Sequence, residues 1–65
     1  MKLNDRVKHE EYGKGIIIHI MYEGTRRELL AVRFDKSDSS LHNCFGLCED
    51  NHGKFFKENE LEILE

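Results

Sequence analysis

The segment Ile16-Ile17-Ile18-His19-Ile20-Met21-Tyr22 limits the fold of this chain more than any other feature of its sequence. Four of its seven residues are isoleucine, whose β-branched side chain is restricted in a helix and packs well on a pleated strand. A turn-forming cluster, Glu23-Gly24-Thr25, follows it, and large apolar residues then occupy every second position of Leu29 to Phe34. Two such segments with a short connection predict an antiparallel hairpin.

Shorter β patterns lie on both sides of this hairpin. Charged and apolar residues alternate in Arg6-Val7-Lys8-His9, which predicts a first strand, and Leu61 to Leu64 predicts a last one. The polar run Lys57 to Glu60 before the last strand is typical of a single 3₁₀ turn. The two glycines of Tyr12-Gly13-Lys14-Gly15 indicate a turn or a close approach of two backbones.

The stretch from Asp35 to Lys54 has little periodicity, and a loop of this length in a compact domain is usually functional or stapled. One more strand is expected within it, either at Leu41 to Phe45 or at Gly53 to Phe56. The sequence therefore predicts an all-β fold and a single domain over residues 1–65. We expect a small barrel of about five short antiparallel strands with one long middle loop.

The small size of the chain limits what it can do. It has 65 residues, of which 38% are apolar, against roughly 45–50% in ordinary globular chains. A domain of this size buries only about 60% of its unfolded surface, so a metal or a partner would add useful stability. A deep catalytic pocket does not fit into such a core, which favours a non-enzymatic binding role.

The charges are unevenly distributed along the chain. The net charge is −3, which argues against a domain that binds mainly by neutralising phosphates. Eight basic and six acidic residues give residues 1–36 a net charge of +2, whereas two basic and seven acidic residues give 37–65 a net charge of −5. The surface has a basic and an acidic side if the two halves of the chain do not interleave in the fold. If they do interleave, the charges are scattered over a solvated surface.

Nothing in the sequence has the pattern of a signal peptide, and the longest apolar stretch is interrupted by His19. We therefore expect a cytoplasmic protein that does not enter a membrane. In that compartment the two cysteines are free thiols or metal ligands rather than a disulfide.

The order of apolar residues and glycines resembles that of small SH3-like barrels of the KOW and Tudor-like type. The resemblance rests on Val7-x-His9, Tyr12-Gly13-x-Gly15-x-Ile17-x-x-Ile20, Val32-x-Phe34-Asp35 and Leu61-x-Ile63. It implies the barrel fold, and it implies a bulge that keeps Ile17 and Ile20 on the same face.

The middle loop carries a narrower resemblance. His42-Asn43-Cys44-Phe45-Gly46, followed by Gly53 and the pair Phe55-Phe56, is similar to short proteins of bacteriophages and Gram-positive bacteria that join such a barrel to an H-x-C-x-G segment. This implies a phage or mobile-element origin and no particular activity.

The spacing H-x-C-x3-C-x3-H places His42, Cys44, Cys48 and His52 close together in the sequence. Two thiolates and two imidazoles complete a tetrahedral zinc shell, so the spacing predicts a structural zinc site that would close the loop. No other cofactor is expected.

The same cysteines and histidines also fit roles without a metal. Cys44 and Cys48 can pack as small apolar side chains beside Phe45 and Leu47 while the histidines face water. A disulfide requires the two cysteines to come close enough in space. Catalysis by Cys44 with His42 is disfavoured, because no third group orients the base.

Exposed aromatic and basic residues are the remaining candidates for binding. Aromatic rings with nearby cations can stack bases and meet phosphates, and small barrels bind through their loops and one open face. The candidate binding residues are Tyr12, Lys14, Tyr22, Arg26, Arg27 and Phe45. Phe55 and Phe56 are expected to close the ends of the barrel instead.

Two functions from different classes follow. The first is an adaptor or inhibitor that binds a host protein, using the acidic half and an aromatic patch. The second is an accessory module that binds nucleic acid through the basic N-terminal half. The sequence leaves the oligomeric state open, because strands at the edge of an incompletely closed barrel can pair with a second copy.

Overall fold

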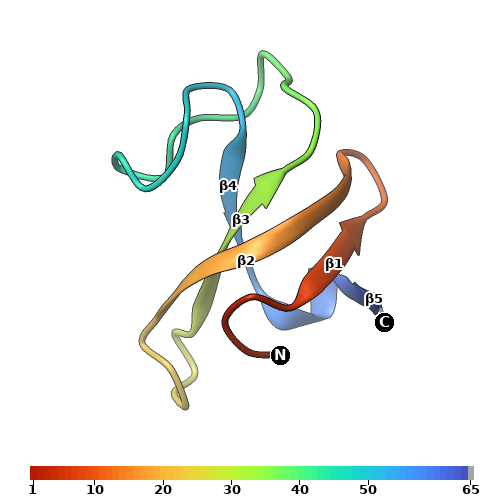
Figure 1. Cartoon of the computed structure of the whole chain (residues 1–65). Helices are drawn as coiled ribbons and strands as arrows, with labels where there is room; N and C mark the ends of the chain where they lie inside the picture. The colour runs from red at the N-terminus through yellow and green to blue at the C-terminus, as the bar shows by residue number, and fades with distance from the viewer. Residues whose placement is uncertain (65) are drawn as a thin grey trace.

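A computed structural model describes residues 1–64 of the chain, and within them five β-strands and one 3₁₀ helix form. The elements are β1 (Arg6–His9), β2 (Gly13–Met21), β3 (Leu29–Phe34), β4 (Gly53–Phe56), η1 (Glu58–Glu60) and β5 (Glu62–Leu64). Every pairing is antiparallel, and the strands follow the order β4-β3-β2-β1-β5 (Figure 1). The prediction of an all-β chain built from about five short antiparallel strands is confirmed.

Most elements lie where the sequence predicts them. Strands β1 and β3 have the predicted bounds, β5 begins one residue later, and η1 begins after Lys57. Of the two candidates for a strand in the middle region, Gly53–Phe56 forms β4. The segment 41–45 forms no strand, and His42 makes only an isolated bridge to Gly53.

Strand β2 is longer than predicted because its two glycines belong to the sheet. Lys14 pairs with Lys8 of β1, while Gly15 pairs with both Val7 and Phe34. A Cβ atom at Gly15 would lie 2.6 Å from the carbonyl oxygen of Arg33. Gly15 is therefore the predicted position of close backbone approach, where a larger residue does not fit.

The predicted bulge in β2 is also present. The register between β2 and β3 shifts between Ile17 and His19, so Ile17 faces Val32 and Ile20 faces Leu30. Because Leu30 and Val32 share one face of β3, the bulge keeps both isoleucines directed to the core.

The core lies on one face of the sheet. It consists of the buried side chains Val7, Ile17, Leu30, Val32, Phe34, Leu41 and Phe56, with Met1, Tyr12, Ile20 and Leu61 packed against them. Strands β4 and β5 stand at the two edges and do not pair with each other within residues 1–64. Leu41 comes from the middle loop, so the loop supplies part of the core that the short edge strands leave uncovered.

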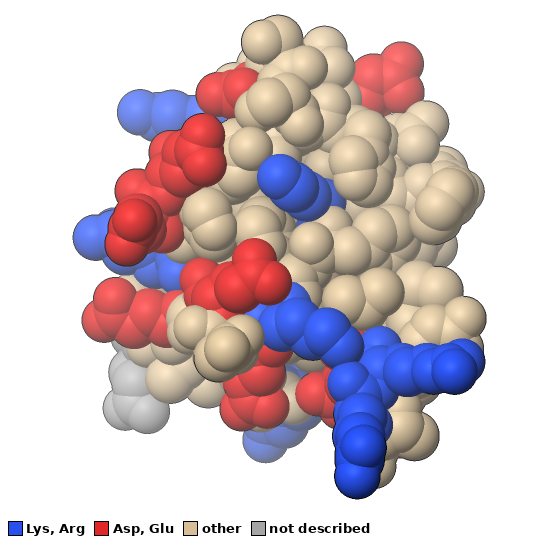
Figure 2. Space-filling model, turned by 180° about the vertical axis from the view of Figure 1, so that it is seen from behind, with Lys and Arg blue, Asp and Glu red and all other residues tan. Residues whose placement is uncertain are grey.

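The two charged halves interleave in the fold. The acidic C-terminal strand β5 pairs with β1, and β4 pairs with β3, so neither half forms a separate pole. Figure 2 shows acidic and basic side chains mixed on the left, while mainly Lys and Arg occupy the lower right. Within residues 1–64, no helix has the length and apolar character that crossing a bilayer requires.

Candidate functional site

The middle loop, residues 35–52, is held to the sheet by backbone hydrogen bonds. The amide of Phe34, the last residue of β3, donates to the carbonyl of His52 at 2.7 Å, and within the loop the amide of Asp38 donates to the carbonyl of Asn51 at 2.9 Å. His42 donates to Gly53 at 2.8 Å and accepts from the same residue at 2.7 Å. With Leu41 buried in the core, these bonds fix the base of the loop, as a functional loop on a scaffold requires.

The tip of the loop is a left-handed turn. Cys44, Phe45 and Gly46 have φ values of 52°, 59° and 92°, a conformation that costs a non-glycine residue about 1–2 kcal/mol. The carbonyl of Asn43 accepts hydrogen bonds from the amides of Gly46 and Cys48, each at 3.1 Å. The side-chain oxygen of Asn43 accepts from Gly46 as well, at 3.2 Å. These bonds offset the cost and define the direction in which Phe45 points.

Phe45 projects from this turn into solvent. Its side chain is 87% exposed, and Leu47, two residues on, is 49% exposed. The ring of Phe45 packs on that of Phe55 with 5.6 Å between centroids, and Phe55 in turn lies 5.9 Å from the ring of His42. We refer to His42, Phe45, Leu47 and Phe55 as the Phe45 surface.

The Phe45 surface departs from the sequence-based prediction in two ways. Packing of Phe45 and Leu47 beside the cysteines would bury them, but the left-handed turn directs both outward. Phe56 joins the core as expected. Phe55 does not, because adjacent residues of a strand point to opposite faces of the sheet.

The two cysteines lie beneath the turn, against Gly53. Both are free; Cys44 is buried and Cys48 is half-buried. A Cβ atom at Gly53 would lie 2.6 Å from the sulfur of each cysteine, so the two sulfurs are less than twice that distance apart. Burial, together with the neighbouring Cys48 thiol, raises the pKa of Cys44 to about 12.

The structure brings only two of the four predicted zinc ligands together. The Nδ1 atom of His42 accepts a hydrogen bond from the amide of Cys44 at 2.9 Å. The Nδ1 atom of His52 lies 3.1 Å from the carbonyl oxygen of Asp50. In the described part of the chain, no three His, Cys, Asp or Glu side chains are arranged to hold a metal ion. The zinc site stays a prediction that requires the loop to rearrange.

An ion pair ties the loop to the sheet. Glu49 accepts two hydrogen bonds from Arg33 of β3, at 2.7 Å from Nε and 2.5 Å from a terminal nitrogen. Such a two-point pair is stronger and more specific than a single contact. The Arg33 guanidinium lowers the pKa of the Glu49 carboxyl to about 2.

The six predicted binding residues fall in three places. Tyr12 is half-buried against the core, where its hydroxyl accepts a hydrogen bond from Ser40 at 3.0 Å. The ammonium group of Lys54 stands 5.3 Å from the Tyr12 ring centroid. Tyr12 is thus already engaged within the protein, and Lys14 is exposed near it at the start of β2.

Tyr22, Arg26 and Arg27 come together in the turn between β2 and β3. Tyr22 is 57% exposed, and the ammonium group of Lys57 donates to the carbonyl of Arg26 at 2.9 Å. We refer to Tyr22, Arg26, Arg27 and Lys57 as the basic tip. It lies at the opposite end of β3 from the middle loop that carries Phe45, so the two surfaces are separate (Figure 1).

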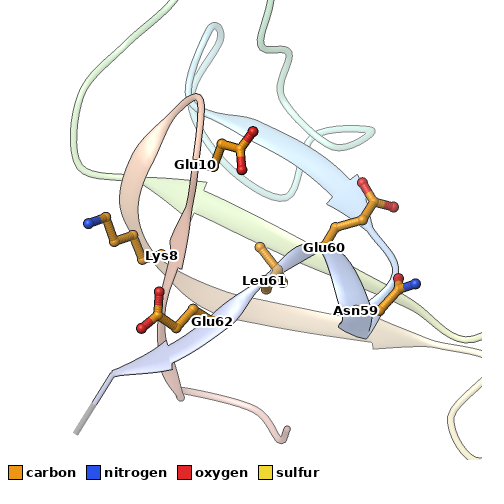
Figure 3. Close-up of a pocket in the computed structure, with 6 residues that line it drawn as sticks. All are labelled: Lys8, Glu10, Asn59, Glu60, Leu61 and Glu62. Atoms are coloured by element: carbon orange, nitrogen blue, oxygen red, sulfur yellow. The ribbon is translucent and has the colours of Figure 1, made fainter.

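A hollow also opens between β1 and the C-terminal segment, lined by Lys8, Glu10, Asn59, Glu60, Leu61 and Glu62. In Figure 3 the carboxylates of Glu60 and Glu62 point to opposite sides of Leu61. Because the acidic groups do not converge, the hollow offers no cation site and no paired carboxylates for acid–base chemistry.

In comparisons with known proteins, no family model and no curated protein sequence matches this chain. Sequence reasoning selected Phe45 but missed Leu47, Phe55 and the ring of His42 as its neighbours. The only local signal for the turn is Gly46, because Cys44 and Phe45 are residues that rarely take positive φ.

Proposed function

We propose that this chain is a non-enzymatic binding module that docks on another protein through the Phe45 surface. The observation that carries the proposal is the conformation of Phe45. A large apolar side chain is 87% exposed at a backbone position with φ of 59°, where its presence lowers stability rather than adding to it. Residues kept in such conformations cluster at ligand clamps and binding sites.

The support beneath Phe45 suits a binding hot spot. The hydrogen bonds to Asn43 hold the backbone of the turn before any partner arrives, and the ring of Phe45 lies beside that of Phe55. Binding then requires little additional ordering, which favours affinity. A central aromatic anchor surrounded by weaker contacts is the usual arrangement in protein interfaces.

The charges of the loop indicate the chemistry of the partner. Residues 35–52 contain four carboxylates and one lysine, a net charge of −3. Arg6 pairs with Asp35 and Arg33 with Glu49, while Asp38 and Asp50 accept hydrogen bonds only from the neutral groups of Ser40 and Asn43. We propose a partner with an apolar pocket for Phe45 and basic residues at its rim. The resemblance to phage proteins supports a host protein in this role.

The test compares two exposed aromatic residues at left-handed positions, Phe45 and Tyr22. The immobilised protein and its Phe45→Ala and Tyr22→Ala variants are incubated with bacterial extract, and each retained protein is purified for affinity measurements. A partner that Phe45→Ala binds at least about 30-fold more weakly, with Tyr22→Ala unchanged, supports the proposal. Equal affinity of Phe45→Ala and the unmodified protein refutes it.

Charge variants provide a second control. Glu58→Gln, Glu60→Gln and Glu62→Gln remove acidic groups near the hollow of Figure 3 and leave the loop untouched. We expect the triple variant to retain the partner, because its charges lie outside the Phe45 surface. If this variant no longer bound the partner, the interface would include the C-terminal segment.

The second candidate function is nucleic-acid binding, which the basic tip favours. It joins an exposed tyrosine to three cations, the combination that single-stranded nucleic acid requires. Binding of a fluorescent single-stranded oligonucleotide should weaken steeply between low and physiological salt, and Arg26→Gln with Arg27→Gln should reduce that dependence. Absence of binding at low salt would eliminate this function.

We also propose that the sheet belongs to the SH3-like barrels. Support comes from the strand order, the bulge in β2, and the 3₁₀ helix before the last strand. Distances between β4 and β5 measured in solution would establish closure if the two strands approach each other and would exclude it if they stay apart.

A further inference from the structure

We propose that Cys44 and Cys48 form a reversible modification site, at which a low-molecular-weight disulfide converts two free thiols into an intramolecular disulfide. The observation behind this inference is their shared contact with Gly53. Both sulfurs lie 2.6 Å from the point that a Cβ atom of Gly53 would occupy. The absence of a side chain at that one position lets the two thiols lie side by side.

The surrounding bonds hold this arrangement. The amide of Leu47 donates to the carbonyl of Cys44 at 3.3 Å, and the amide of Cys48 donates to Asn43 at 3.1 Å. The chain therefore reverses direction between the two cysteines, which brings their side chains to the same side of the turn. Approach of the sulfurs to bonding distance requires local movement of the side chains rather than unfolding of the loop.

The two thiols differ in access, which sets the order of events. Cys48 is half-buried, so its thiolate can attack a sulfur of the external disulfide, form a mixed disulfide and release one small thiol. Cys44 is buried beside it with a raised pKa, so only the small fraction of its thiol that has lost a proton attacks the Cys48 sulfur and releases the second small thiol. Two protein thiols are oxidised and one small disulfide is reduced, and the two protons are taken up by the two released thiols.

The modification would act on the turn that presents Phe45. The new bond closes a ring over residues 44–48, and the ring contains Phe45, Gly46 and Leu47. The consequence for a partner rests on the proposed function: oxidation fixes the exposed conformation of Phe45 and tightens binding. The chemistry of the two cysteines does not depend on that function.

The test uses the full chain in mixtures of oxidised and reduced glutathione. At each mixture, the products are identified by intact mass and peptide mapping, for the folded protein and for the same chain in denaturant. We expect a monomer that has lost two hydrogen masses, with a Cys44–Cys48 link. The equilibrium constant for oxidation should be at least about tenfold larger in the folded chain.

Single variants separate the two roles. Cys44→Ser should stop at a glutathione adduct on Cys48, and Cys48→Ser should react far more slowly because its remaining thiol is buried. Only adducts or intermolecular dimers in the unmodified protein, or oxidation no more favourable than in denaturant, would overturn the proposal. Partner affinity is measured separately, so an intramolecular disulfide without partner binding would refute the proposed function alone.

Discussion

The ring of Phe45 lies 5.6 Å from that of Phe55, so a side chain at the tip of a loop is supported by the edge strand β4. This contact links the left-handed turn of the middle loop to a strand of the sheet. The direction in which Phe45 points and the freedom of its ring to move have separate causes. The hydrogen bonds of Asn43 set its direction, and Phe55 limits its movement.

The left-handed conformation of Phe45 predicts an unusual order of stabilities. Phe45→Gly should be more stable than Phe45→Ala by about 1 kcal/mol, because glycine adopts positive φ without strain. At Lys8, an exposed position in β1, the order should be reversed, because glycine weakens a strand. Urea unfolding of the four variants measures both differences. If the alanine variant were more stable than the glycine variant at position 45, as it is expected to be at position 8, Phe45 would not be held in a left-handed conformation in solution.

Gly53 should not tolerate even one methyl group. A Cβ atom there would meet both cysteine sulfurs at 2.6 Å, and overpacking of this kind costs about 1–3 kcal/mol. Cys44→Ala removes one of the two sulfurs. The double variant with Gly53→Ala and Cys44→Ala should therefore lose less stability than the sum of the losses in the two single variants. Additive free energies of unfolding would show that the sulfurs do not press on this position.

The Arg33–Glu49 pair predicts a loss of stability in acid. The pKa of Glu49 is lowered from 4.5 to about 2, chiefly by the hydrogen bond with Arg33. A carboxyl with a lowered pKa in the folded state contributes stability above pH 4.5 and loses it as the pH falls towards 2. The free energy of unfolding of Glu49→Gln should lack this pH-dependent contribution. Parallel pH profiles for Glu49→Gln and the unmodified protein would contradict the lowered pKa of Glu49.

The zinc prediction can be tested by metal content and melting. A zinc site would require His42 and His52 to leave their present backbone contacts, so a purified protein without zinc, with a melting temperature that a chelator leaves unchanged, would refute the prediction. One zinc per chain, together with a large fall in melting temperature on chelation, would show that the loop rearranges around the metal.

The strands were predictable because their signals are local. β1 alternates charged and apolar residues, β3 has a large apolar residue at every second position, and the bulge in β2 agrees with what the family resemblance implies. β4 was one of two alternatives, since Gly53 and Lys54 at its start resemble a loop. Its choice depends on pairing with β3, a contact over more than twenty residues of sequence that no local pattern encodes.

The Phe45 surface was harder to predict because the turn that exposes Phe45 does not follow from the conformational propensities of its residues. Cys44 and Phe45 take positive φ only because Asn43 accepts two backbone hydrogen bonds across the turn. Hydrophobicity alone suggests that both side chains are buried, yet only Cys44 is, whereas Phe45 is exposed. The zinc site stays a prediction for a related reason: spacing places residues near one another along the chain, while hydrogen bonds direct the rings of His42 and His52.

The pairing of β1 with β5 has a practical consequence. Because Arg6 pairs with Leu64, the start of β1 and the end of β5 lie on the same side of the molecule, while the middle loop emerges on the other side (Figure 1). A fluorophore, a surface tether or a fused protein at either end would leave the loop unobstructed. The chain is therefore suited to display Phe45 outward from whatever carries it, a property useful for immobilised binding measurements.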